Sequence, residues 1–158
     1  IYLEENQKLG TAGSLSLLPD KPDAPMIVMN CDLLTKANLA EMLNFHNYEH
    51  NVMTVALKRE EIEIPYGIAK LEGTRITQLQ EKPKYIHFIN TGIYIIEPFI
   101  IDRIPKDTFY DMNTLIEQLI SADLRIGSFP VHEYWVDIGQ ENQLRQAREE
   151  YSREFPTN

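Results

Sequence analysis

Short apolar runs alternate along this chain with segments of helical periodicity, and this alternation constrains the fold most strongly. The run from Met26 to Met29 follows Pro25 and is continuously apolar, as is typical of a strand buried on both faces of a parallel sheet. Residues 52–57, 93–96 and 126–131 predict three further strands. Alternating strand and helix signals favour an α/β layered fold.

Helix and turn signals lie between these strands. Thr35 is predicted to cap a helix with Leu39, Met42 and Leu43 on its apolar face. Asp111 is predicted to cap a second helix, whose inward residues are Met112, Leu115, Ile116 and Leu119. Residues 140–151 predict a polar C-terminal helix, and the turn at residues 72–74, centred on Gly73, predicts a hairpin.

Length and charge narrow the class of protein. The 158 residues fit one domain, 1–158, and the formal net charge of -9 does not suit general nucleic-acid binding. No apolar run approaches the roughly 20 residues that cross a membrane, so we expect no membrane partner. Cys31 is the single cysteine, which excludes an internal disulfide and favours a reducing compartment, the cytoplasm. We expect neither a catalytic thiol at Cys31 nor a zinc site, because the four histidines lack zinc-site spacing.

Two aspartates directly follow apolar segments. Asp32 follows the strand at 26–29, where ligands of open α/β sheets collect, and a carboxylate there can hold Mg²⁺ against phosphate oxygens. Asp137 follows Trp135 and Val136 and precedes Gly139. Each aspartate alone is also compatible with turn or cap chemistry. Together they make a two-carboxylate magnesium site possible, provided that the fold brings them together.

Two further segments are weak signals individually. In Glu81-Lys82-Pro83 the lysine is a compact cation suited to a phosphate, although an exposed charge pair before a turn is the simpler interpretation. The small residues from Gly10 to Gly13 allow a ligand to approach the backbone, but they match neither a P-loop nor a nucleophile elbow.

Six segments, taken in order, resemble the sugar-1-phosphate nucleotidylyltransferases, the enzymes that make nucleotide-sugars such as GDP-mannose and dTDP-glucose. They are residues 9–13, 29–32, 65–67, 81–83, 90–94 and 135–139, and they cover nearly the whole chain. The resemblance is strongest to the GDP-mannose branch, which favours GTP as the nucleoside triphosphate. It implies a Rossmann-like fold, with a mixed, mostly parallel central sheet and flanking helices.

The resemblance also implies site residues. Asp32 and Asp137 would bind the catalytic Mg²⁺, and Lys82 would contact the phosphate of the sugar-1-phosphate. Gly10 and Thr11 would lie near the base and ribose, whereas Tyr66, Gly67, Glu81, Asn90 and Thr91 would form the sugar pocket. A phosphate oxygen of the sugar-1-phosphate would attack the α-phosphate of the nucleoside triphosphate and release pyrophosphate. Members of the family often form dimers.

This sequence departs from the family pattern in two ways. Cys31 stands where the family usually has Gly or Ser, which would strain a loop that needs positive φ. The family's N-terminal glycine-rich loop, which grips the triphosphate, is not in the sequence. We therefore expect an exposed apolar sheet edge and little activity from this chain alone. A non-catalytic relative that binds sugar phosphate and a nucleotide-sugar glycosyltransferase are the alternatives.

Overall fold

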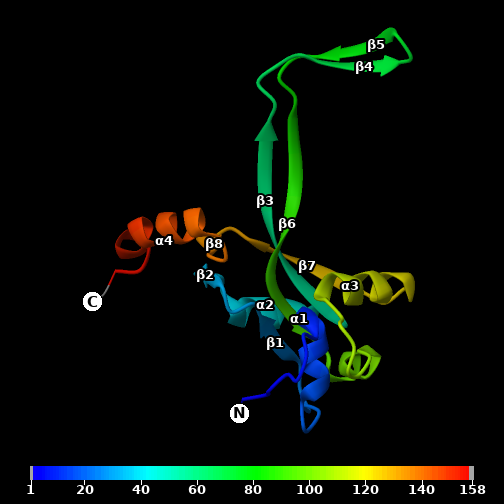
Figure 1. Ribbon diagram of the computed structural model, residues 1–158, viewed down its shortest axis with the longest axis vertical. Helices are drawn as coiled ribbons and strands as arrows, with labels where there is room; N and C mark the ends of the chain where they lie inside the picture. The colour runs from blue at the N-terminus through cyan, green and yellow to red at the C-terminus, as the bar shows by residue number, and fades with distance from the viewer. Residues whose placement is uncertain (1, 157–158) are drawn as a thin grey trace.

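The computed structural model describes residues 2–156, in which strands and helices alternate as expected (Figure 1). The helices are α1 (Gly10–Gly13), α2 (Leu39–Tyr48), α3 (Met112–Ser121) and α4 (Glu141–Glu154), with 3-10 segments η1 (Ser14–Leu17) and η2 (Pro98–Arg103). The strands are β1 (Met26–Met29), β2 (Leu33–Thr35), β3 (Met53–Glu63), β4 (Ile68–Glu72), β5 (Arg75–Gln80), β6 (Lys84–Ile96), β7 (Ile126–Val131) and β8 (Trp135–Asp137).

The central sheet has four strands in the order β1-β6-β3-β7. β6 runs antiparallel to both of its neighbours, and β7 runs parallel to β3. Three strands therefore share one direction while β6 opposes them. This confirms the expected mixed sheet, although two of its three pairings are antiparallel.

The prediction that β1 is a fully buried strand of a parallel sheet is wrong. β1 lies at the edge of the sheet and pairs antiparallel with β6. Its side chains alternate in burial, and Ile27 and Met29 remain 41% and 40% exposed. A continuous apolar run does not reveal whether a second strand will cover its outer edge. The expected exposed apolar edge is confirmed at β1.

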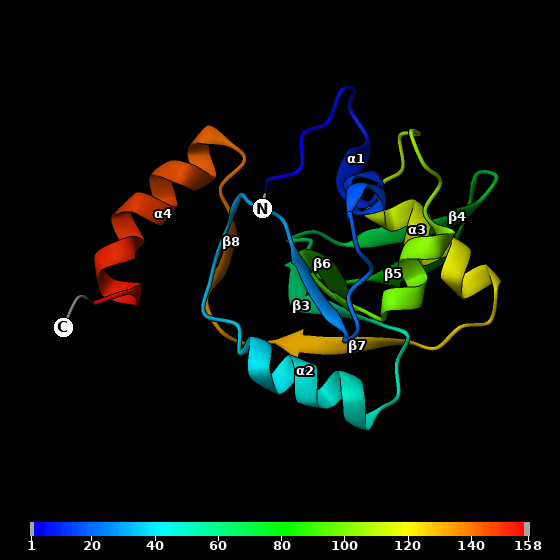
Figure 2. The same ribbon diagram turned by 90° about the horizontal axis from the view of Figure 1, so that it is seen from below.

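Helices cover both faces of the sheet, with α1 and α3 on one side and α2 on the other (Figure 2). The first face packs Met53, Val55 and Ile96 against apolar residues of α1, α3 and η2. The second face packs Ile93 and Ile95 around Met42 of α2. These two apolar clusters form the core of the part that we call the body, which comprises residues 2–57 and 90–156.

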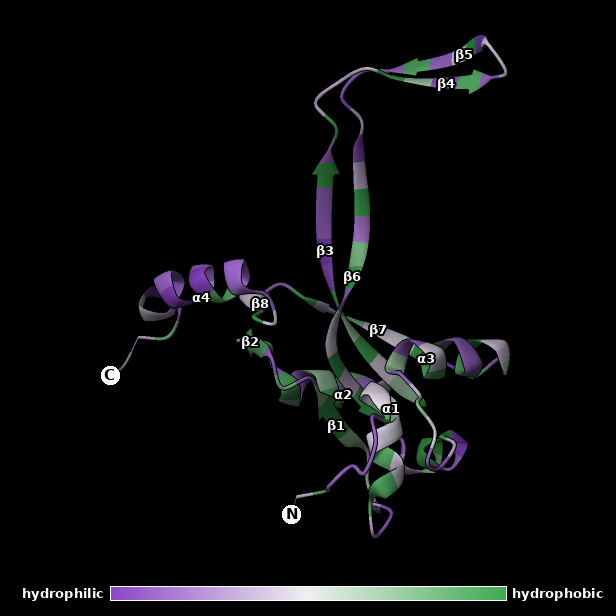
Figure 3. Ribbon diagram, in the orientation of Figure 1, coloured by the Kyte–Doolittle hydropathy of each residue, from purple (hydrophilic) through white to green (hydrophobic). Residues whose placement is uncertain are grey.

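β3 and β6 extend well beyond the segments predicted for them. Past the body they continue as a two-stranded hairpin that carries β4 and β5 at its far end (Figure 1). We call residues 58–89 the arm. Its β3 strand is mainly polar, whereas its β6 strand mixes polar and apolar residues (Figure 3), and nearly all of its side chains are exposed or partly exposed. The predicted hairpin at Gly73 is confirmed between β4 and β5, with Gly73 at φ +60°.

Helix α2 begins later than predicted. Its cap is Asn38, whose side chain accepts a hydrogen bond from the backbone N–H of Glu41, and not Thr35. Thr35 ends β2 instead, and its hydroxyl donates to the carbonyl of Tyr134 at 3.0 Å. The predicted cap of α3 is confirmed, because the carboxylate of Asp111 accepts from the backbone N–H of Thr114 at 2.8 Å.

The C-terminal helix, α4, follows the small β2–β8 sheet and lies to one side of the central sheet (Figure 1). It is predominantly polar, as predicted, and only Ala147 is buried in it. Across residues 2–156 no helix combines the length and apolar character that spanning a bilayer requires.

Candidate active site

The two predicted magnesium carboxylates converge on Gly139. β2 and β8 pair antiparallel with Leu33 opposite Asp137, and the backbone N–H of Ile138 donates to the carbonyl of Asp32 at 2.8 Å. A Cβ atom added to Gly139 would lie 2.9 Å from Oδ2 of Asp32 and 3.1 Å from Oδ1 of Asp137. Residues about a hundred positions apart in sequence therefore present their carboxylates to one small space.

This space is open because Gly139 has no side chain. The backbone N–H of Gly139 also donates to Oδ1 of Asp137 at 2.8 Å, which fixes the orientation of that carboxylate. Among the residues that the structure describes, no group of three or more His, Cys, Asp or Glu side chains surrounds a possible metal position. A pair of carboxylates is nevertheless enough for Mg²⁺, which usually keeps several waters and takes further oxygens from substrate phosphates. The two aspartates fit such an ion.

An irregularity in β6 connects these carboxylates to the sheet. Between the pairs Val55↔Tyr94 and Leu57↔Asn90, β3 contributes one residue and β6 contributes three. The carbonyl of Gly92 accepts from the backbone N–H of Asn30, and the carbonyl of Thr91 accepts from Nε1 of Trp135, both at 3.0 Å. Bulges often re-aim groups next to active sites. Here one bulge holds the segments that lead to both aspartates.

The bulge requires a glycine at position 92. Gly92 has φ +75°, and a Cβ there would come within 2.7 Å of Nδ2 of Asn30. The hydroxyl of Thr91 donates to the carbonyl of Ala56 at 2.8 Å, and Thr91 is almost fully buried. Its side chain is therefore occupied within the sheet, although the resemblance assigned Thr91 to the sugar pocket.

The segment from Gly10 to Gly13 packs closely against the start of α3. Gly10 has φ +79°, and a Cβ there would come within 2.8 Å of the carbonyl oxygen of Tyr110. The hydroxyl of Thr11 accepts from the backbone N–H of Met112 at 2.9 Å. This close approach accounts for the glycine at position 10 without a ligand, while Thr11 is exposed and also lines two cavities.

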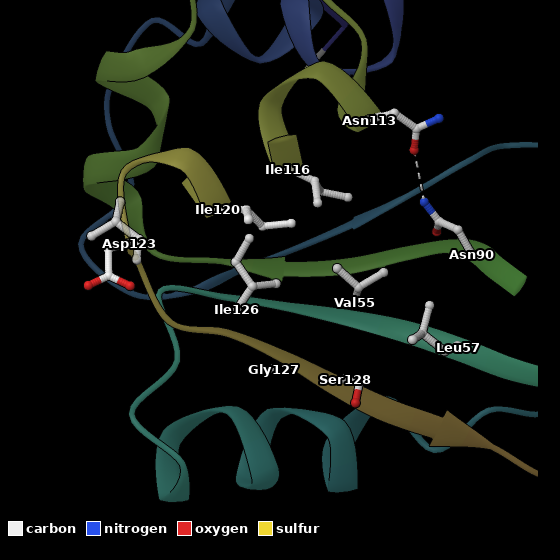
Figure 4. Close-up of a pocket in the computed structure, with 11 residues that line it drawn as sticks. Val55, Leu57, Asn90, Asn113, Ile116, Ile120, Asp123, Ile126, Gly127 and Ser128 are labelled. Carbon is white, nitrogen blue, oxygen red and sulfur yellow. Dashed lines mark hydrogen bonds between the residues drawn. The ribbon is translucent and has the colours of Figure 1, made fainter. Parts of the chain in front are cut away.

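Three cavities adjoin one another on this side of the body. The first, about 450 Å³, extends from Thr11 to Cys31 and Asp32. The second, about 240 Å³, shares Thr11 and Asn30 with the first. The third, about 500 Å³, lies between α3 and the sheet, has mainly aliphatic walls, and shares Asn90 and Asn113 with the second (Figure 4).

The second cavity is polar and carries no charged side chain. Three asparagine amides line it, from Asn30, Asn90 and Asn113, together with the side chains of Thr11 and Tyr94. Burial raises the pKa of Tyr94, so its hydroxyl stays protonated at neutral pH and can donate. Amides and hydroxyls both donate and accept hydrogen bonds, as recognition of a polyhydroxylated ligand requires.

The remaining predicted site residues lie together on the arm. The backbone N–H of Lys82 donates to the carbonyl of Tyr66 at 3.2 Å, and a Cβ at Gly67 would lie 3.1 Å from Oε2 of Glu81. All four residues are exposed. The structure thus groups the predicted residues into a body cluster, at Asp32, Asn90 and Asp137, and an arm cluster. Figure 1 shows the arm pointing away from the body, so the two clusters do not meet.

Two backbone angles bear on the predicted loops. Lys82 has φ +44°, a left-handed conformation that costs free energy in a non-glycine residue and that concentrates at functional sites. Among the residues that the structure describes, those with positive φ do not include Cys31. A glycine at this position would therefore relieve no strain. The strain considered for Cys31 therefore does not arise.

Asn30 and Asn113 were not among the predicted site residues. Asn30 lies inside the segment at 29–32, so the sequence signal was present but was assigned to Asp32. Asn113 lies in the first turn of α3, far from every segment that suggested a site, and only the packing of α3 beside β6 brings it to the cavity.

Comparison with known proteins identifies the family. The sequence profile described as "Nucleotidyl transferase" matches residues 1–154. The chain belongs to the nucleotidyl transferase family. This agrees with the fold.

Among curated members of the family, the chain is similar to mannose-1-phosphate guanylyltransferases. It is 34% identical over 146 residues to the catalytic subunit beta of Dictyostelium discoideum, covering 88% of this chain and 40% of that protein. It is 31% identical over 146 residues to the probable mannose-1-phosphate guanylyltransferase 3 of Oryza sativa subsp. japonica, with 87% and 40% coverage. The chain thus spans about two fifths of the length of these relatives.

Solved structures show the same Rossmann-like α/β fold at low sequence identity. HddC from Yersinia pseudotuberculosis, in a complex with GMP-PN, superposes with a TM-score of 0.66 at 19% identity and covers 93% of this chain and 64% of HddC. A structure from Bacillus anthracis in complex with sucrose has a TM-score of 0.70 at 17% identity, with coverage of 98% and 65%.

Proposed function

We propose that this chain forms the sugar-phosphate side of a sugar-1-phosphate nucleotidylyltransferase, which transfers a nucleotide from GTP to a hexose 1-phosphate and releases pyrophosphate. The observation that carries the proposal is the convergence of Asp32 and Asp137 on Gly139, in a chain of the nucleotidyl transferase family. The curated relatives, mannose-1-phosphate guanylyltransferases by name, support the choice of guanine and of a hexose phosphate. The single cysteine is consistent with a cytoplasmic setting.

In this proposal Asp32 and Asp137 hold Mg²⁺, which supplies positive charge to the phosphate oxygens of the substrates. The chain itself positions the reacting groups. The hydrogen bond from the backbone of Gly139 keeps Asp137 oriented, and the bulge at Gly92 holds the segments that lead to both aspartates. Such positioning and charge neutralisation provide most of the catalysis in phosphoryl-type transfer, which needs no protein nucleophile.

The arm has a separate part in the proposal. Lys82 would bind the phosphate of the sugar-1-phosphate, while Tyr66, Gly67 and Glu81 would contact the sugar. Because the arm points away from the body, the proposal requires the two clusters to approach each other when substrate binds. The proposed reaction also needs the family's triphosphate-binding loop, which residues 1–158 do not contain.

Pyrophosphate release is the direct test of the reaction. The chain and a form extended upstream would be assayed with GTP, UTP and dTTP against mannose 1-phosphate and glucose 1-phosphate. We expect release only from the extended form, fastest with GTP. An extended form that binds sugar phosphate but never releases pyrophosphate would support a non-catalytic relative instead. Transfer from a GDP-sugar without pyrophosphate formation would support a glycosyltransferase.

The metal site is tested by two variants and a matched control. Asp137→Asn removes a ligand charge, and Gly139→Ala places a methyl group 2.9 Å from Asp32, so each should weaken Mn²⁺ binding by roughly 10- to 100-fold. Mn²⁺ is measured by its paramagnetic effect on water relaxation, which does not depend on activity. The exposed Asp123→Asn is the control. Unchanged Mn²⁺ binding in Asp137→Asn would refute the role given to that carboxylate.

A further inference from the structure

Asn113 is held in a defined orientation beside Asn90. Nδ2 of Asn90 donates to Oδ1 of Asn113 at 3.2 Å, and Oδ1 of Asn90 accepts from the backbone N–H of Gly92 at 3.1 Å. The second bond makes the carbonyl of Asn90 the acceptor and its amide nitrogen the donor. The oxygen of Asn113 must therefore face Asn90, and both side-chain amides have a unique assignment.

This assignment leaves the amide nitrogen of Asn113 available. Figure 4 shows its oxygen directed at Asn90 and its nitrogen directed away. Within residues 2–156, no hydrogen bond joins that nitrogen to another protein group, and Asn113 is exposed. Asn113 also lines the uncharged polar cavity. Two N–H donors are thus presented at the edge of a cavity whose other polar side chains are amides and hydroxyls.

The chemistry of the cavity identifies the type of ligand group. No lysine, arginine or carboxylate lines it, so it offers no charge to a phosphate, whereas the carboxylate pair and Lys82 lie elsewhere. Neutral amides recognise hydroxyl groups because each can both donate and accept. A site that binds a hydroxyl by a hydrogen bond discriminates strongly against analogues that lack it.

We propose that Asn113 is a specificity-determining residue for the sugar. Its amide nitrogen donates to one hydroxyl oxygen of the sugar ring, and its carbonyl holds the amide of Asn90 in the orientation that serves the same ring. The inference rests on the proposed function, in that the ligand is a hexose 1-phosphate. It adds Asn113, a residue of α3, to the sugar-pocket residues that the family resemblance implied.

Binding of α-D-mannose 1-phosphate to the chain, followed by NMR and calorimetry, tests the inference. Asn113→Ala loses both the donor and the support of Asn90, and we expect roughly 10-fold weaker binding. Asn113→Asp keeps the acceptor for Asn90 but loses the donor, so binding should weaken while the side-chain NMR signal of Asn90 stays in place. Measurement at about 1 M salt, where the Debye length is about 3 Å, screens the repulsion between the added charge and the sugar phosphate. Asn44→Ala, an exposed asparagine on α2, is the matched control.

Monodeoxy sugar 1-phosphates give the sharpest readout. One of them should lose less affinity in Asn113→Ala than mannose 1-phosphate does, because the hydroxyl that Asn113 contacts is already missing and only the support of Asn90 is lost. The inference is overturned if mannose 1-phosphate binds equally to both chains, or if every deoxy analogue loses the same factor in Asn113→Ala. In those cases sugar-phosphate binding and the proposed function still stand. If neither the chain nor an upstream-extended form binds any sugar phosphate, the proposed function itself fails.

Discussion

β3 and β6 pass through two different environments, and the contrast between them separates what stabilises this molecule from what it presents to a ligand. In the body, Met53 to Ala56 and Thr91 to Ile96 are buried between helices. In the arm, the same two strands continue with mostly exposed side chains, among them Ile62, Ile86 and Phe88. Their ladder is antiparallel in both regions. The hydrogen-bond pattern of these strands therefore does not determine whether their side chains are buried. The helices that cover the two faces of the sheet do.

Hydrogen exchange should show the largest difference between the two regions. A two-stranded hairpin without a packed face is marginally stable in water, so the arm should open locally while the body opens only on global unfolding. Amides of 53–56 and 93–96 should be protected roughly 100-fold or more beyond those of 59–63 and 84–88. Equal protection in both regions would mean that the arm folds cooperatively with the body.

A matched pair of leucine truncations sharpens the same contrast. Leu115 in α3 is fully buried, so Leu115→Ala should lower the free energy of unfolding by about 2–5 kcal/mol. Leu79 in β5 is 71% exposed, so Leu79→Ala should change it by about 0.5 kcal/mol or less. Urea unfolding followed by circular dichroism measures both. A large loss for Leu79→Ala would show that the arm packs against other parts of the molecule in solution.

Protonation of histidines should reveal a smaller difference between body and arm, in how the free energy of unfolding depends on pH. In the body, burial lowers the pKa of His46, although Glu97 opposes this effect. Nδ1 of His46 lies 2.8 Å from the hydroxyl of Thr54. Below about pH 6.5 the unfolded chain takes up a proton that folded His46 resists, so the free energy of unfolding should fall as the pH drops below that value.

The histidine variants locate the effect. His46→Gln should flatten the stability profile between about pH 6.5 and 5, whereas His87→Gln, on the exposed arm, should leave the slope as it is. Thermal unfolding across this pH range measures both variants. An unchanged slope in His46→Gln would assign the pH dependence to other groups.

Local chemistry predicted the elements whose determinants lie within a few residues. The hairpin at Gly73 and the cap at Asp111 are of this kind, since one turn or one side chain decides each. Thr35 and Asn38 can both cap a helix, and the choice between them depends on β2 pairing with β8 a hundred residues away. The sequence of β1 equally does not reveal that this strand lies at the edge of the sheet.

The candidate site divides in the same way. Asp32 and Asp137 were identifiable as carboxylates after apolar segments, and the family resemblance joined them into one site. Their meeting at Gly139 required the fold. Asn113 had no local signal, because it reaches the cavity through the packing of α3 against β6. Nor did the sequence indicate that Lys82 and Asp32 lie on separate parts of the molecule.

The bulge in β6 has a consequence for anyone who redesigns this protein for stability. Removing its two additional residues would give β3 and β6 an uninterrupted ladder and would eliminate the left-handed glycine at position 92. The same deletion would displace the carbonyls that hold Asn30 and Trp135, and with them both carboxylates. Regular strand pairing and the candidate active site thus make opposite demands on this stretch, and a sequence optimised for pairing alone would lose the site.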